Sequence, residues 1–203
     1  MTKDNNHETR KREDILLAAE QVFAERGFKG TTVREVAQKA GIANSLIFYY
    51  FKNKVVLYEA VFEHTFSQLE RLIQQNLDLK LDQLTKLKKI MFSVIDLAVR
   101  HRNSLKIMIR EVIDNGGIAQ KISRKYFKPL YSVTSEFLAK GKKEALFRDV
   151  DPFHFLHNMM GVIAFYFISD PLFQAVGVED PYGSEEIEKR KIEVWNIVRT
   201  SLT

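Results

Sequence analysis

The chain has 203 residues, of which 45% are hydrophobic, and it carries a net charge of +5 and no cysteine. This length allows one domain, or a small domain joined to a larger one, and the apolar content is sufficient for a folded core. The lack of cysteine excludes disulfides and thiolate metal sites, the polar N-terminus excludes a secretory signal, and the longest apolar run, residues 159–168, is too short for a membrane span. We therefore expect a cytoplasmic protein with no membrane partner.

The positive charge is concentrated near the N-terminus. Residues 26–54 contain six Lys and Arg residues against one acidic residue, whereas residues 55–203 contain 21 against 19. A local excess of positive charge favours a polyanionic partner such as nucleic acid. On charge alone, an ordinary solvated surface explains the pattern equally well.

Helical periodicity predicts a first helix that ends at Gly27 and a second that is bounded by specific capping residues. In the first helix, apolar residues recur at i, i+3, i+4 and i+7, namely Ile15, Ala18, Ala19, Val22 and Phe23. In the second, Thr32 and Glu35 have the spacing of a capping box, and Gly41 can end the helix in a left-handed conformation.

The rest of the chain also has helical spacing, and strand alternation is missing. A third short helix is predicted over residues 44–50, and a fourth begins at Lys54 and continues past Leu72. Further helices are predicted over 82–101, 104–114, 118–145, 152–169 and 185–201, with breaks at Asn115-Gly116-Gly117, Arg148-Asp149, Pro171 and Pro181-Tyr182-Gly183. The fold class is therefore all-α.

The stretch GIANSLIFYYFKNK, residues 41–54, places four consecutive aromatic residues before two lysines. Successive side chains on a helix are about 100° apart, so Ile47 and Phe51 share one face and pack against the first helix. Phe48 and Tyr49 then point outward, where aromatic rings and hydroxyls beside cations suit a sugar-phosphate backbone.

The spacing of Ala37, Gly41 and Ile47 indicates a helix-turn-helix. Two helices that cross steeply over a short turn need a small residue at the crossing, a glycine in the turn and a branched apolar residue on the second helix. Such a triplet is common by chance in helical proteins. It becomes specific in combination with the capping box, the basic surroundings and the aromatic block.

Residues 12–61 resemble the N-terminal domain of the TetR family of bacterial transcriptional regulators. The resemblance lies in the ordered motifs of ILLAAEQVFAERGFKGTTVREVAQKAGIANSLIFYYFKNKVVLYEAV and covers roughly a quarter of the chain. It implies a three-helix, helix-turn-helix domain over residues 1–54 that binds operator DNA. It also implies a larger helical domain over residues 55–203 that binds a small effector and forms a homodimer.

The same resemblance implies which residues contact DNA: Thr32, Arg34, Ala43, Asn44, Ser45, Leu46, Phe48, Tyr49, Tyr50 and Lys54, the last matching the family's phosphate-binding lysine. Three positions depart from the family pattern. Asn44 replaces a common lysine, Leu46 a small polar residue, and Phe48 the usual tyrosine, which implies a different base preference. Asn44 could read an adenine edge, and Leu46 either touches a thymine methyl group or simply packs.

The residues before the first helix are also basic. Arg10, Lys11 and Arg12 either form an arm that reaches the DNA backbone or minor groove, or belong to a disordered, solvated tail.

Two C-terminal helices have the composition of a dimer interface. The helix over 152–169 is apolar all round, so it must be buried or covered by a partner. Pairing with the last helix in a four-helix bundle would also double the DNA-binding unit. The predicted interface residues are Phe153, Leu156, Met160, Gly161, Ala164, Phe167, Val194, Ile197 and Val198. The alternative is that both helices are ordinary core of a monomer.

An effector pocket is expected inside the larger domain. Bulky side chains at helical spacing line core more often than a ligand site, and few basic groups accompany them, which favours an apolar or aromatic ligand. The candidates are Phe92, Ile95, Leu105, Met108, Phe127, Tyr131, Met159 and Phe165.

Evidence for catalysis is weak. His154 and His157 have a spacing that can chelate zinc, but no acidic residue lies on the same face, and no phosphate loop or nucleophile motif is present. We expect no enzyme activity, catalytic residue, metal or cofactor. The sequence favours a homodimeric one-component transcriptional repressor with a small effector. The alternatives are an activator or an effector-independent DNA-binding protein and, less favoured, a helical enzyme.

Overall fold

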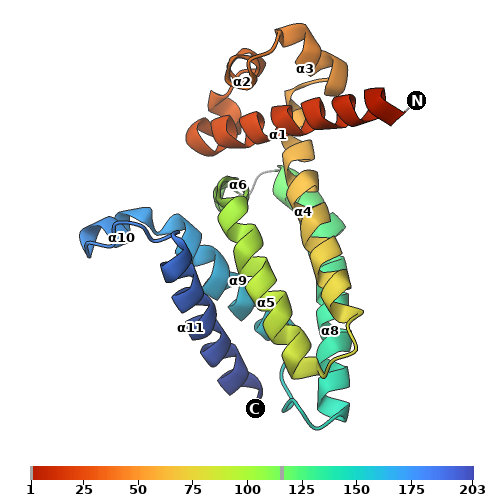
Figure 1. Cartoon of the computed structure of the whole chain (residues 1–203), viewed down its shortest axis with the longest axis vertical. Coiled ribbons are helices and arrows are strands. Elements are labelled where there is room, and N and C mark those ends of the chain that lie inside the picture. Colours follow the sequence, from red (N-terminus) through yellow and green to blue (C-terminus); the bar gives the residue numbers. More distant parts are fainter. Residues whose placement is uncertain (1, 115–116) are drawn as a thin grey trace.

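The computed structural model describes residues 2–114 and 117–203, and every regular element within them is a helix (Figure 1). This confirms the all-α fold class. The N-terminal helices are α1 (Thr2–Gly30), α2 (Val33–Ala40), α3 (Asn44–Tyr50) and α4 (Lys54–Leu77). They are followed by α5 (Gln83–Arg100), α6 (Arg102–Ile113), α7 (Gly117–Ile122), α8 (Lys128–Lys143), α9 (Pro152–Ala164), α10 (Asp170–Ala175) and α11 (Ser184–Leu202).

Two of the predicted helices are interrupted. The helix predicted over 118–145 is divided into α7, a π-helical turn (Ser123–Phe127) and α8, and the one predicted over 152–169 ends in a 3₁₀ turn (Phe165–Ile168). Such turns re-aim the side chains on either side of them, which periodicity alone does not show. The predicted break at 115–117 lies mostly outside the described residues.

The basic residues of the expected N-terminal arm belong to α1, which begins at Thr2 and bends at Gly27, where φ is 71°. Arg10, Lys11 and Arg12 therefore form neither an arm before the first helix nor a disordered tail, whereas their contact with DNA stays a prediction. A contact of Arg12 helps to explain why this segment is helical. Its guanidinium lies over the Phe51 ring, 5.2 Å from the ring centre. A cation–π contact of this kind holds the polar turn of α1 against the end of α3.

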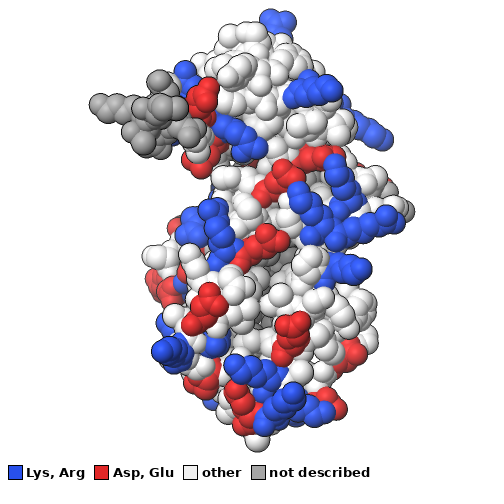
Figure 2. Space-filling view, turned by 90° about the vertical axis from the view of Figure 1, so that its right-hand side faces the viewer, with Lys and Arg blue, Asp and Glu red and all other residues white. Residues whose placement is uncertain are grey.

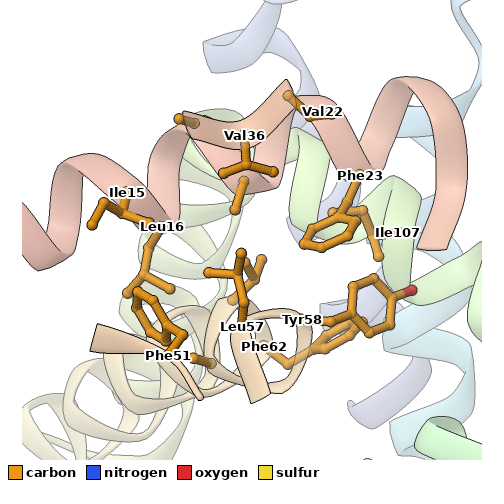
Figure 3. Packing of buried hydrophobic residues seen from close by; sticks show 14 of the residues in the cluster. Ile15, Leu16, Val22, Phe23, Val36, Phe51, Leu57, Tyr58, Phe62 and Ile107 are labelled. Carbon is orange, nitrogen blue, oxygen red and sulfur yellow. The ribbon is translucent and has the colours of Figure 1, made fainter. Parts of the chain in front are cut away.

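Helix α1 lies across the upper ends of α4 and α6, with α2 and α3 above it (Figure 1). Apolar side chains of α1, α2, α3 and α4 form one hydrophobic cluster, which also includes Ile107 of α6 and Ile122 of α7. Figure 3 shows Phe23 facing Tyr58, with ring centres 4.8 Å apart, and Phe62 beside Tyr58 at 5.1 Å. The three-helix head therefore shares its core with the larger helical part, and the predicted boundary after Lys54 falls inside this cluster.

A second cluster joins α5, α8, α9 and α11. It includes Phe167, Val194 and Val198, each at most 1% exposed. Their prediction as dimer contacts was wrong. Helix α11, which carries Val194 and Val198, packs against α5 and α9 of the same protomer, and the Phe167 ring stacks on Tyr182 with ring centres 5.8 Å apart. No helix in the described part of the chain is both long and apolar enough to cross a membrane.

The close approach of α8 and the chain after it depends on Gly141. A Cβ atom at this position would lie 2.0 Å from Cδ2 of the buried Phe147 ring. We predict that Gly141→Ala lowers the free energy of unfolding by about 1–3 kcal/mol, since overpacking outweighs the better helix propensity of alanine. Urea denaturation measures this loss. Gly30→Ala, whose Cβ would have its nearest neighbour at 3.6 Å, is the control, and a Gly141→Ala protein as stable as this control would contradict the prediction.

Candidate nucleic-acid interface

The start of α2 is held by the predicted capping box. The Thr32 hydroxyl accepts the Glu35 backbone N–H at 3.3 Å, and the Glu35 carboxylate accepts the Thr32 backbone N–H at 2.8 Å. The Thr32 backbone N–H first, and then the Thr32 hydroxyl, which also donates to the carboxylate at 2.9 Å, hold the pKa of the Glu35 carboxyl below its ordinary value. The carboxylate also pairs with Arg26, so the single acidic residue between 26 and 54 is already engaged within the protein.

The turn between α2 and α3 has the predicted glycine geometry. Gly41 adopts the left-handed conformation, with φ 66° and ψ 32°, and its N–H donates to the last carbonyls of α2. A residue with a Cβ would be strained there. The turn lets α3 leave steeply from α2, as a helix-turn-helix requires.

Residues 47–51, which include four consecutive aromatic residues, divide between core and surface. Ile47 and Phe51 are each 1% exposed, whereas Phe48 is 49% and Tyr49 is 70% exposed. The predicted orientation of α3 is therefore confirmed. Helix α3 lies at the end of the molecule distant from the labelled parts of α8 and α11 (Figure 1).

The ten residues predicted to contact DNA fall into two groups. Exposed are Thr32, Arg34, Ala43, Asn44, Ser45, Phe48 and Tyr49, and half-buried are Leu46, Tyr50 and Lys54. On the face drawn in Figure 2, the upper end of the molecule is mainly uncharged, with separate Lys and Arg side chains around it. A mixed surface of this kind suits groove contact by α3 and phosphate contact at its rim.

The comparisons with known proteins agree with this geometry. Residues 15–61 match the model of the bacterial regulatory proteins of the tetR family. The repressor NicS of Pseudomonas putida is 31% identical over 145 residues, which cover 69% of this chain and 67% of NicS. The chain belongs to the TetR family of bacterial regulatory proteins.

Two further proteins are similar to the chain, one in sequence and one in fold. The repressor KstR2 of Mycolicibacterium smegmatis is 32% identical over 101 residues, which are 50% of this chain and 49% of KstR2. The structure of the regulator FadR from Bacillus subtilis in complex with stearoyl-CoA covers 94% of this chain and 99% of FadR, with a TM-score of 0.73 and 18% identity. The structural likeness at this identity supports the shared TetR-family fold.

Lys54, which the family resemblance assigns to a phosphate, is turned inward in this TetR-family chain. Its ammonium group donates to the backbone carbonyls of Phe28 and Thr31, both at 2.9 Å, and lies 4.4 Å from the centre of the Phe28 ring. The lysine therefore joins the start of α4 to the end of α1, where carbonyl groups lack helical partners. One of its three N–H groups remains for a phosphate, and that contact stays a prediction.

Sequence reasoning missed two features of this surface. The Tyr49 hydroxyl donates to the Glu8 carboxylate at 3.3 Å, which brings an acidic residue of α1 to the recognition helix. The Asn53 side chain accepts the Val56 N–H at 3.0 Å and caps α4. The Asn53 cap was readable, since Asn is a preferred N-cap residue before a helix. The Tyr49–Glu8 contact was not, because it depends on α1 continuing through a polar segment.

The eight predicted ligand residues do not meet at one site. Ile95 is 1% exposed and lies in the second core cluster, whereas Tyr131 is 41% and Phe165 is 60% exposed. Two surface hollows stand out in the described residues, and none of the eight lines either of them. One is formed by residues around α7, and the other lies between α4 and α5.

Six of the nine predicted dimer residues remain available on the protomer surface. Phe153 and Ile197 are half exposed, at 50% and 51%. Gly161 is exposed, and Leu156, Met160 and Ala164 are partly exposed along α9. An exposed Ile192, at 53%, extends the apolar surface along α11.

The inward contacts of Lys54 lead to a stability prediction. Replacing Lys54 with alanine removes a charged donor from two carbonyl groups and leaves that of Phe28 with only the Thr31 N–H at 3.4 Å, so we expect the free energy of unfolding to fall by about 1–3 kcal/mol. Chemical denaturation followed by circular dichroism measures the change. Lys52→Ala removes an exposed lysine of the same turn and should leave stability nearly unaltered; equal stability of the two variants would refute the structural role of Lys54.

Proposed function

We propose that the chain is a homodimeric one-component transcriptional repressor that binds operator DNA through α2 and α3. The observation that carries the proposal is the division of α3, whose buried face anchors it on the head while Asn44, Ser45, Phe48 and Tyr49 stay exposed. KstR2 and NicS are both named transcriptional repressors, which favours repression over activation. Residues 1–54 would supply the DNA contacts, and residues 55–203 the dimer and effector sites.

The recognition helix would enter the major groove with its N-terminal end foremost. Asn44 and Ser45 lie in the first turn of α3, where side chains of a recognition helix reach base edges. Leu46 is half-buried, so a contact with a thymine methyl group would use only part of its side chain. Arg34 of α2 and Tyr49 of α3 are exposed and would contact phosphates.

Dimerisation would use the exposed faces of α9 and α11. Their apolar residues Phe153, Ile192 and Ile197 are 50%, 53% and 51% exposed on the protomer, and a helix face of this composition is covered in an assembly. A twofold pair would place two α3 helices on successive major grooves, which multiplies both affinity and specificity.

A small ligand would alter operator affinity by shifting α4. This helix begins in the head cluster and runs the length of the larger helical part (Figure 1), so a change at its far end would move the head. The ligand must bind the two conformations with different affinity for this to occur. The FadR structure with stearoyl-CoA is an example of a protein of this fold with a bound small molecule. An apolar or aromatic ligand would bind among the eight predicted residues, and an apolar site would have to open between the helices for it to do so.

Two substitutions separate the proposed roles on DNA. Arg34→Ala should weaken binding to all sequences alike and reduce the slope of log affinity against log salt by about 0.9, the contribution of one phosphate contact. Asn44→Ala should instead change the preference at one base position, at a cost of about 1–3 kcal/mol for the preferred base. Fluorescence anisotropy with labelled duplexes at several salt concentrations measures both effects.

Lys89→Ala is the control for these measurements, since Lys89 is an exposed residue of α5, remote from α3 (Figure 1). If all three variants gave the same affinity and the same salt slope as the unmodified chain, α2 and α3 would not be the DNA-binding surface.

The dimer proposal leads to a second test. We expect the double variant Phe153→Glu and Ile197→Glu to be monomeric at micromolar concentration, because charges would be buried in an apolar interface without partners. Its operator affinity should fall at least about a hundredfold with the loss of the second head. Val112→Glu, at an apolar residue that is 58% exposed on α6, is the control. A dimer that persists in the double variant in sedimentation analysis would place the interface elsewhere.

A further inference from the structure

A polar cleft lies between α4 and α5, apart from the residues predicted to bind an effector. Its volume is about 430 Å³, and seven of the nine residues that line it are polar or charged. Only Leu72 and Leu97 are apolar. The volume is within the range of small-molecule sites, but the lining is far more polar than that of a typical apolar pocket. A ligand of this cleft must therefore be hydrophilic.

The charge available in the cleft is positive. Arg71 from α4 and Arg100 from α5 both line it, and neither has an acidic partner among the described residues. Arg71 uses only its Nε–H, which donates to the Ser67 carbonyl at 3.2 Å. The one acidic residue of the lining, Asp96, is paired with the buried Lys191, whose Nζ lies 2.7 Å from Oδ1 of Asp96 and 2.6 Å from the Glu188 carboxylate, so the two arginines outnumber the acidic groups of the lining.

We propose that this cleft binds a small organic anion with a carboxylate or phosphate group, which Arg71 and Arg100 hold. Guanidinium groups offer paired N–H donors that match the oxygens of both groups. Gln75 and Ser93 line the same cleft and would bind hydroxyl or carbonyl groups on the body of the ligand. This ligand class differs from the apolar one that the sequence favours, because the cleft is formed by helix faces that are polar in both α4 and α5.

The cleft is joined to α1 by a chain of hydrogen bonds that starts at Gln68. Gln68 lines the cleft, and its side-chain oxygen lies 3.3 Å from Nε2 of His101. On its other side, Gln68 Nε2 lies 3.0 Å from Nε2 of His64. Burial first, and then the neighbouring His101, lower the pKa of His64, so the neutral His64 ring accepts the amide proton and sets the orientation of Gln68.

His101 connects Gln68 to the head through the other nitrogen of its ring. Its Nδ1 lies 3.5 Å from the Glu20 carboxylate of α1, and the other oxygen of Glu20 accepts the Ser104 N–H in the first turn of α6 at 2.9 Å. Glu20, His101 and Ser104 are buried, with exposures of 5%, 6% and 3%. Buried polar groups of this kind lose much of their stabilisation when one partner is removed. The position of α1 on α6 is therefore sensitive to what Gln68 binds.

An anion in the cleft would compete for Gln68 and change the charge next to His101. The contact between Glu20 and the start of α6 would loosen, and α1 would move with the rest of the head. The effect of this movement on DNA affinity rests on the proposed operator binding, whereas binding of the anion does not. Because coupling is reciprocal, operator DNA would lower the affinity for the anion by the same factor.

Isothermal titration of the full chain tests the binding step. The probes are citrate, glucose 6-phosphate and inorganic phosphate, with glucose as the uncharged control. We expect at least one anion to bind with a dissociation constant below about 1 mM, and Arg71→Gln and Arg100→Gln each to weaken it about tenfold or more, as for the loss of a charged hydrogen bond. Lys89→Gln, on α5 outside the cleft, should bind like the unmodified chain.

The same titration also distinguishes the two ligand chemistries. Preference for citrate indicates a carboxylate ligand, and preference for glucose 6-phosphate or inorganic phosphate indicates a phosphate ligand. The proposal is wrong if no anion binds at 10 mM, or if the arginine variants and Lys89→Gln bind equally well.

Hydrogen exchange tests the relay without reference to DNA. The bound anion should accelerate exchange of the Ser104 amide in the unmodified chain, and Glu20→Gln, which removes the charged acceptor of that amide, should reduce the acceleration. If the anion binds and Ser104 exchange stays the same, the cleft is a binding site without the relay. If Ser104 responds but no duplex is bound, the proposed function fails and the inferred site stands.

Discussion

The burial of Ile47 and Phe51 is the constraint on which the rest of the structure depends. Each is 1% exposed, and together they hold α3, only seven residues long, against the head. A helix of this length is unstable in isolation, so its conformation comes from packing. Because helical geometry separates neighbouring side chains by about 100°, the same packing leaves Phe48 and Tyr49 at the surface.

That packing is continuous with the larger helical part. Leu57, Tyr58 and Phe62 of α4 and Ile107 of α6 belong to the same cluster as the head, so the head is not an independent unit on a flexible linker. Lys54 strengthens the junction through the carbonyls at the end of α1. A protein built in this way can transmit a change in the helices below the head as a change in the angle of α3, since packed cores shift between discrete arrangements.

The sequence was most informative where local rules decide the structure. The capping box of Thr32 and Glu35, the left-handed Gly41 and the orientation of α3 all follow from neighbouring residues, and the structure confirms them. Family resemblance added the expected role of α3, which geometry alone does not test.

The remaining features depend on contacts between distant residues. The polar start of α1 has no hydrophobic periodicity, and its contacts to Phe51 and Tyr49 arise only in the folded head. Similarly, α9 has apolar residues on most of its circumference, with His154, His157 and Asn158 as its polar residues, so sequence could not tell which side faces α11 of the same protomer. The buried Glu20 and His101 are 81 residues apart and show no local signal of their pairing.

The central claim is that a twofold pair of heads inserts α3 into successive major grooves. The most direct measurement is selection of duplexes from a random-sequence pool by the purified chain, followed by sequencing. The account predicts an enriched inverted repeat, with half-sites about one helical turn (roughly 10 base pairs) or a multiple of a turn apart. Enrichment of no sequence, or of a single site without symmetry, would contradict it.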